Sequence, residues 1–172
     1  MARIEPLVEK MFPLEGGFCN DPDDKGGPTN MGVTLATWKS QGYDKDGDND
    51  IDIDDLKLIT SEDVINLLRW YWNRWKADQI VNQSIAEFLV DWVWNSGTAG
   101  IKIPQRVLKV GADGKVGPMT INAVNNANQL ELFNDLKAAR REFIDDICDN
   151  DWSQRKFKQG WYNRIDSFVF KK

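Results

Sequence analysis

The sequence predicts a mainly α-helical protein with at most a small β element. After residue 60, apolar residues recur every three to four positions along most of the chain, which is typical of amphipathic helices. Strand-like residues gather only around residues 32–35. The length of 172 residues suits one ordinary domain, and 41% hydrophobic and 28% charged residues are typical of a globular protein in water.

An apolar helical stretch opens the chain and gives way at Glu15 to a glycine-rich loop that contains Asp24 and Thr29. One interpretation of Glu15 is structural: it is the last residue of a helix that stops at Gly-Gly. An acid at the negative end of a helix is slightly unfavourable, however, which favours a functional role. Two carboxylates and a hydroxyl at an apolar wall suit glycoside hydrolysis. That reaction needs one protonated group and one side chain that holds water or stabilises an oxocarbenium-like carbon. The spacing alone leaves both interpretations open.

Residues 44–55 alternate aspartate with other residues in the pattern of a twelve-residue EF-hand loop. Asn49 stands at position six, where glycine is usual, and asparagine tolerates left-handed backbone better than most residues. We expect this loop to bind Ca²⁺ in a structural role, with no cofactor for catalysis. The alternative is a solvated acidic turn. The expected ligands, at positions one, three, five, seven, nine and twelve, are Asp44, Asp46, Asp48, Asp50, Asp52 and Asp55.

A capping-box sequence at Thr60–Asp63 predicts the start of a helix whose apolar face runs from Val64 to Trp75. Four further helices are expected over residues 85–97, 103–110, 130–148 and 152–168, with a bend in the last at Gly160. The helix over residues 103–110 should stop at Gly111. Trp72, Trp75 and Trp92 lie on the apolar faces of their helices and should be buried, whereas Trp70 and Trp94 fall off those faces and are candidates for a sugar-binding cleft.

Composition and charge exclude several classes of protein. The chain has no histidine, which excludes Cys–His peptidases and histidine-dependent zinc amidases. No basic stripe interleaves with aromatic residues, so we expect no nucleic-acid partner. No apolar run approaches the roughly 20 residues of a membrane-spanning helix, so no membrane insertion is expected. The two cysteines, Cys19 and Cys148, are expected to be reduced thiols.

The stretch LEGGFCNDPDDKGGPTNMGVT resembles the N-terminal signature of glycoside hydrolase family 108, the N-acetylmuramidases also named secretion activators. Its order of Glu, Asp and Thr is also similar to that of phage-type lysozymes. Met31 departs from the family pattern, where an aromatic residue is usual, and Pro28 stands where a small residue is usual. The resemblance implies a lysozyme-like helical fold.

The resemblance also implies roles for individual residues. Glu15 would be the general acid, Asp24 would hold the nucleophilic water or stabilise positive charge, and Thr29 would help to position that water. Glycines in the loop would let the backbone approach the glycan closely. The expected substrate-binding residues are Gly16, Gly17, Gly26, Gly27, Asn30 and Asn95.

The second half of the chain resembles the predicted peptidoglycan-binding region that follows the catalytic part in this family. The motifs that carry this resemblance begin with Asn95–Gly97 and Pro104–Arg106, continue with Asp113–Gly114 and Gly117–Pro118, and end with Gly160–Arg164. We therefore expect a catalytic part over residues 1–94, with the EF-hand-like loop at 44–55, and a peptidoglycan-binding region over 95–172, packed together as one compact body.

The expected function is hydrolysis of the β-1,4 bond between N-acetylmuramic acid and N-acetylglucosamine in peptidoglycan, by a monomer. The N-terminus has no signal-peptide core, because Glu5, Glu9 and Lys10 interrupt it. We therefore expect synthesis in the cytoplasm and action in the periplasm or cell wall after release by another factor. The alternatives are a non-catalytic peptidoglycan-binding protein that aids secretion, and a lytic transglycosylase. The sequence leaves inversion or retention at the anomeric carbon open.

Overall fold

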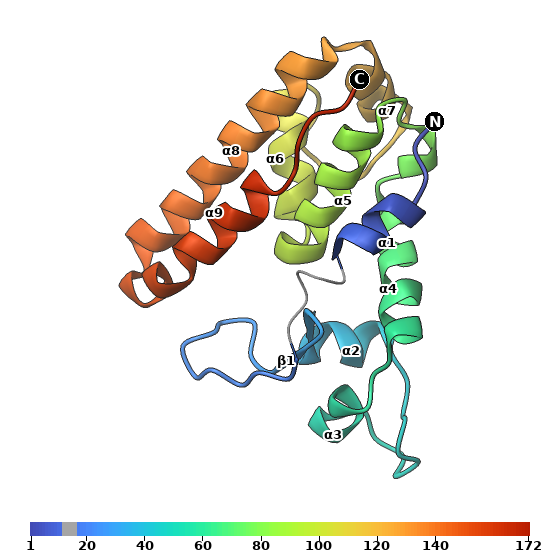
Figure 1. The fold of residues 1–172 in the computed structure, drawn as a ribbon, viewed down its shortest axis with the longest axis vertical. Coiled ribbons are helices and arrows are strands. Elements are labelled where there is room, and N and C mark those ends of the chain that lie inside the picture. The colour runs from blue at the N-terminus through green and yellow to red at the C-terminus, as the bar shows by residue number, and fades with distance from the viewer. Residues whose placement is uncertain (12–16) are drawn as a thin grey trace. The chain divides into compact units, whose positions relative to one another are not determined.

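A computed structural model describes residues 1–11 and 17–172 of the protein (Figure 1). In these residues the fold is mainly α-helical and lysozyme-like, with one two-stranded antiparallel sheet, as predicted. Contacts divide the chain into two compact units, one formed by Met1–Leu7 with Trp70–Lys172 and the other by Val8–Arg69. The helices are α1 Glu5–Met11, α2 Leu35–Gln41, α3 Ile53–Lys57, α4 Ser61–Arg74, α5 Gln83–Ser96, α6 Ala99–Val107, α7 Pro118–Asn126, α8 Gln129–Asn150 and α9 Lys158–Asp166.

Short elements complete the described chain. The strands are β1 Thr29–Asn30 and β2 Val33–Thr34, and 3₁₀-helices cover Ala77–Gln79 and Trp152–Phe157. No described helix is both long enough and apolar enough to cross a bilayer. Cys19 is exposed, Cys148 is buried, and both are free thiols, as expected.

The larger unit is built around α5, whose middle is buried on every side. Figure 1 shows α8 and α9 side by side, and α5 packs against both α6 and α8. The Phe88 ring makes edge-to-face contacts with Trp92, Phe133 and Phe168, at centroid distances of 5.5–6.0 Å. Such pairs add to the stability that burial of apolar area provides. The core therefore joins α5 to α8 and to the C-terminal segment after α9.

Helix α6 begins earlier than predicted, at Ala99 and not at Ile103, and ends at Val107. Pro104 lies inside it and has no N–H to donate to the carbonyl of Gly100 four residues before. The indole N–H of Trp75 donates to that carbonyl instead, at 3.3 Å. A Cβ on Gly100 would lie 2.5 Å from the Val93 backbone nitrogen, so only glycine allows α6 to approach α5 this closely. These two tertiary contacts extend the helix beyond its sequence pattern.

The smaller unit contains a β-hairpin where a strand was expected. Asn30 pairs with Val33, and the two turn residues Met31 and Gly32 have φ values of 49° and 76°. Positive φ at both positions characterises the type I′ turn that favours hairpins. The expected strand therefore ends at Thr34, because Leu35 already belongs to α2, a helix that was not predicted. The Thr34 hydroxyl accepts the Thr37 N–H at 3.1 Å and caps this helix.

The other helices largely match their predicted ranges. The Thr60 N–H donates to the Asp63 carboxylate at 2.7 Å and the Asp63 N–H donates to the Thr60 hydroxyl at 3.4 Å, which confirms the capping box. Trp72, Trp75 and Trp92 are buried, as predicted. The break in the last helical stretch was placed wrongly, because the 3₁₀-helix gives way to α9 at Phe157–Lys158 and Gly160 lies inside α9.

Candidate functional site

The glycine-rich loop is closed by backbone pairing. Cys19 and Thr29 exchange two N–H to carbonyl hydrogen bonds of 2.8 Å, and Thr29 also pairs with Thr34 in the hairpin. Thr29 is therefore fixed on both sides by backbone. Its hydroxyl makes no hydrogen bond within residues 1–11 and 17–172. The predicted general acid Glu15 and its neighbour Gly16 lie outside the described residues.

Asp24 is a half-buried residue inside this closed loop. Its Oδ1 accepts the Gly26 N–H at 2.8 Å, and its backbone carbonyl accepts the Gly27 N–H at 2.9 Å. A Cβ on Gly26 would lie 3.1 Å from the same Oδ1, so glycine allows the close approach. Gly27 has a φ of +70°, which favours glycine. The loop thus orients the carboxylate, while its Oδ2 accepts no hydrogen bond in the described chain.

Asn30 is buried and its side chain joins the hairpin to α3. The Nδ2 group donates to the Leu56 carbonyl at 2.9 Å and to the Lys57 carbonyl at 3.4 Å. The last carbonyls of a helix have no partner within the helix, so this amide satisfies them. The structure gives Asn30 a structural role that sequence reasoning missed, and its contact with substrate stays a prediction.

The aspartate-rich segment 44–55 forms two groups of carboxylates. In each, three side chains bring an oxygen within 4.8 Å of the others, and these groups are Asp44, Asp46, Asp48 and Asp50, Asp52, Asp55. The backbone has positive φ at Gly47, inside the first group, and at Asn49, between the two groups, where φ is 73°. Asn49 therefore fills the position of the usual EF-hand glycine with the required backbone. Oxygen donors alone, in this order, are the set that Ca²⁺ prefers.

The pKa values of the aspartates in this segment shift in different directions. Desolvation, with the nearby charge of Asp48, raises the pKa of the Asp46 carboxyl, and the charge of Asp48 raises the pKa of Asp50. The pKa of Asp55 is lowered instead, first by the Asp52 N–H and then by that of Lys45. These N–H groups donate to the two Asp55 oxygens. A bound cation would offset the charge of Asp48 that acts on Asp46 and Asp50, and Ca²⁺ binding at this loop stays a prediction.

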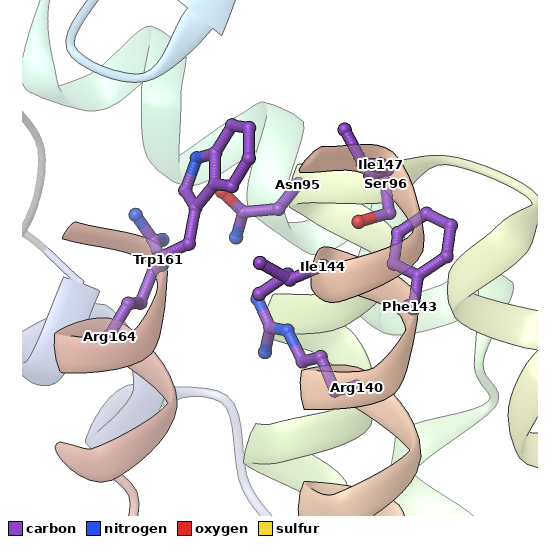
Figure 2. Close-up of a pocket in the computed structure, with 8 residues that line it drawn as sticks. All are labelled: Asn95, Ser96, Arg140, Phe143, Ile144, Ile147, Trp161 and Arg164. Carbon is purple, nitrogen blue, oxygen red and sulfur yellow. The ribbon is translucent and has the colours of Figure 1, made fainter. Parts of the chain in front are cut away.

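Asn95, predicted to bind substrate, lines a cavity of about 110 Å³ at the end of α5. Figure 2 shows Trp161 and Arg164 of α9 on one side of it and Phe143 of α8 on the other. The Asn95 Nδ2 group donates to the Asp91 carbonyl at 2.8 Å, which fixes the side chain. The full lining comprises Asn95, Ser96, Arg140, Phe143, Ile144, Ile147, Trp161 and Arg164. The cavity thus combines two aromatic side chains, an amide and two guanidinium groups.

A buried ion cluster holds the two arginines of this cavity in place. Asp91, which is 0% exposed, accepts from Arg140 at 2.8 Å and from Arg164 at 2.8 and 2.9 Å. Burial alone would raise the pKa of the Asp91 carboxyl, but the charges of Arg164 and Arg140 outweigh it and hold that pKa below its ordinary value. The cluster joins α5, α8 and α9. Sequence reasoning found Trp161 and Arg164 only as part of a motif, and no signal indicated Arg140.

Trp70 and Trp94, the two cleft candidates, flank Tyr71. The Trp70 ring is 4.8 Å from the Tyr71 ring and the Trp94 ring is 5.2 Å from it, both edge to face. Trp70 is 40% exposed and Trp94 is half-buried. These exposures leave indole surface on which a sugar ring could stack, and the role stays a prediction.

The chain matches two protein-family models. Residues 8–97 match glycosyl hydrolase 108, a range that contains Glu15, Asp24 and Thr29 and covers more than half of the chain. The chain belongs to this family. Residues 99–166 match a predicted peptidoglycan domain. The two matches give this family member a peptidoglycan-related role as a glycoside hydrolase, with peptidoglycan as its partner and the cell wall as its setting.

A solved structure supports the assignment. The chain is similar to SagA of Brucella abortus, with 26% identity, a TM-score of 0.72, and coverage of 95% of this chain and 93% of that one. None of the curated proteins searched matches the chain. The family models meet between residues 97 and 99, whereas contacts divide the chain after Leu7 and after Arg69. The division into residues 1–94 and 95–172, packed as one body, stays a prediction.

Proposed function

We propose that this glycoside hydrolase is an N-acetylmuramidase. It hydrolyses the β-1,4 bond between N-acetylmuramic acid and N-acetylglucosamine in peptidoglycan strands. The observation that carries the proposal is the order of Glu15, Asp24 and Thr29 inside the matched hydrolase region, with the last two held by a closed loop. Two carboxylates that flank a glycosidic bond are the usual equipment for its hydrolysis.

In this mechanism Glu15 protonates the departing glycosidic oxygen. The Asp24 carboxylate, oriented by the Gly26 N–H, holds the nucleophilic water or stabilises the positive charge that develops at the anomeric carbon. The Thr29 hydroxyl helps to position the water. Glycines in the loop let the backbone approach the sugar rings: Gly16, Gly17, Gly26 and Gly27.

The cavity at Asn95 supports a contact with peptidoglycan. It offers an aromatic ring from Trp161, an amide from Asn95 and an apolar wall from Phe143. Sugars and their acetamido groups bind to such mixtures of aromatic surface and fixed polar groups. We assign one sugar substituent of the bound strand to this cavity, and we keep Asn95 as a substrate-binding residue.

The aspartate-rich loop is assigned to Ca²⁺ in a structural role. When bound, the ion would supply positive charge that neutralises the repelling carboxylates, and it takes no part in the hydrolysis. Asp63, at the start of α4, accepts from Lys45 at 2.7 Å and from the Tyr43 hydroxyl at 3.1 Å. Ordering of the loop therefore bears on the start of α4 as well as on α3, which begins at Ile53.

The test is the activity of Glu15→Gln on purified peptidoglycan. Loss of a general acid costs a factor of about 10²–10⁴ in rate, so the variant should lose at least 99% of the activity at an unchanged melting temperature. The matched control is Glu9→Gln, an exposed acid on α1, which should keep full activity. If Glu15→Gln retains a tenth of the wild-type rate, Glu15 does not have this role.

A further inference from the structure

An open groove of about 680 Å³ lies between α6 and α8, within the matched peptidoglycan region. Its floor is apolar and includes Ile103 of α6 and Phe143 of α8, both half-buried. Small-ligand sites typically enclose roughly 300–1,000 Å³ around an apolar floor with a few polar groups. The groove therefore has the size of a binding site, and none of its lining residues belongs to the acid-bearing loop.

The two rims of the groove carry opposite charges. Lys102 and Arg106 lie four residues apart on α6, and Glu142 and Asp146 lie four residues apart on α8. Residues four apart share one helix face and are separated by about 6 Å along the axis. A cationic row thus faces an anionic row across the apolar floor.

None of these four side chains forms an ion pair or hydrogen bond within residues 1–11 and 17–172. The neighbouring acids of α8 do form pairs, since Asp145 contacts Lys158 at 2.7 Å and Asp149 contacts Arg155 at 3.5 Å. The groove thus keeps charges of both signs available to a ligand.

We propose that this groove binds the peptide stem of peptidoglycan. This inference rests on the proposed wall substrate. Peptidoglycan stems are short peptides that carry free carboxylates and, in many walls, a side-chain amine, which match the cationic and the anionic row. In an extended peptide, alternate residues lie about 6.6–7.2 Å apart, close to the spacing along each rim. The glycan itself carries no ammonium group, so it would leave the anionic row of Glu142 and Asp146 without a partner.

The test measures binding of a disaccharide tetrapeptide muropeptide, whose only amine is on the third residue of the stem, to the full chain by calorimetry or NMR titration. This probe contains GlcNAc linked to MurNAc and lacks the bond that the proposed reaction breaks. Two double variants are compared with the wild type: Lys102→Ala with Arg106→Ala, and Glu142→Ala with Asp146→Ala. The control variants are Lys109→Ala and Asp135→Ala, exposed residues outside the groove.

Each double variant should bind the muropeptide about tenfold more weakly, as expected for lost hydrogen bonds to charged groups. Acetylation of the amine on the probe should weaken wild-type binding by the same factor and should leave the Glu142, Asp146 variant unaffected. The peptide-free disaccharide should bind all variants equally. Equal muropeptide binding by the wild type and both double variants would overturn the proposal, as would equal wild-type binding of the muropeptide and the peptide-free disaccharide.

Cleavage of peptide-free glycan strands separates this inference from the muramidase proposal. The groove variants should cleave such strands at the wild-type rate, because the groove contacts only the peptide. If the wild type does not cleave them but the groove variants still lose muropeptide binding, the muramidase proposal fails and the peptide site stands. If the wild type cleaves these strands and the groove variants bind the muropeptide as the wild type does, the peptide site fails and the muramidase proposal stands.

Discussion

Replacement of Asp91 by Asn is expected to destabilise the protein by about 3–5 kcal/mol, the usual cost of removing one partner from a buried ion pair. Asp91 is fully buried and accepts three hydrogen bonds from two guanidinium groups at 2.8–2.9 Å. The Arg140 side chain is only 5% exposed and that of Arg164 is 14% exposed. The substitution keeps the shape of the side chain but leaves the Arg140 charge buried without its anion.

Thermal unfolding measures this effect. For a chain of this size about 1 kcal/mol corresponds to roughly 2–4 °C, so the melting temperature should fall by roughly 6–20 °C. The matched control is Asp166→Asn, which removes an ion pair with Arg141 whose side chains are 54% and 40% exposed. Such an exposed pair contributes about 0–1 kcal/mol.

The difference in stability between the wild type and Asp91→Asn should also depend on pH. Because the folded-state pKa of Asp91 lies below its ordinary value, its stabilisation is fully present above the unfolded pKa of about 4. It is lost as the pH falls through the folded-state pKa. The difference in stability between wild type and Asp91→Asn should therefore be constant above about pH 5 and shrink in acid. A loss below 1 kcal/mol at pH 7, or a difference that grows in acid, would refute the account of this cluster.

The remaining predictions concern the smaller unit. Calcium should raise the melting temperature of the wild type but not that of the Asp46→Ala, Asp48→Ala double variant. Identical wild-type melting curves in calcium and in chelator would show that the segment is a solvated acidic turn that binds no calcium. Asn30→Ala should lower the free energy of unfolding by about 1–3 kcal/mol, because the Leu56 carbonyl loses its buried donor. The exposed Asn134→Ala serves as its control, and chemical denaturation measures both. An Asn30→Ala variant of unchanged stability and raised KM would assign Asn30 to substrate alone.

Periodicity and capping predicted the long helices because those signals are local. The Thr60–Asp63 box and the apolar faces of Trp72 and Trp92 each lie within one or two helical turns. Helix α2 was missed because it has only seven residues and buries one side chain, Trp38, so its apolar pattern is too short to recognise. The start of α6 was missed because the Trp75 indole that satisfies the Gly100 carbonyl is 25 residues away in the chain.

In the candidate site, too, residues of a local motif could be predicted, whereas contacts between residues far apart in the sequence could not. The loop residues Asp24 and Thr29 were predicted from a contiguous motif, and their roles in the reaction stay predictions. The structure adds the backbone pairing of Thr29 with Cys19 and the hydrogen bond from the Gly26 N–H to the Asp24 carboxylate. The cavity at Asn95 was not predictable, since Asp91 meets Arg140 and Arg164 across 49 and 73 residues of sequence. In the sequence Asp91 is the one acid of the apolar run 88–94, and nothing nearby indicates a partner. Long-range ion pairs leave no local pattern.

The most direct test of the muramidase proposal is mass spectrometry of peptidoglycan digested by the wild-type protein. Hydrolysis by Glu15 and Asp24 predicts fragments that end in reducing N-acetylmuramic acid. Fragments that end in anhydro sugars would show a lytic transglycosylase, and intact strands would show a protein that only binds the wall. Either of these two results would contradict the account.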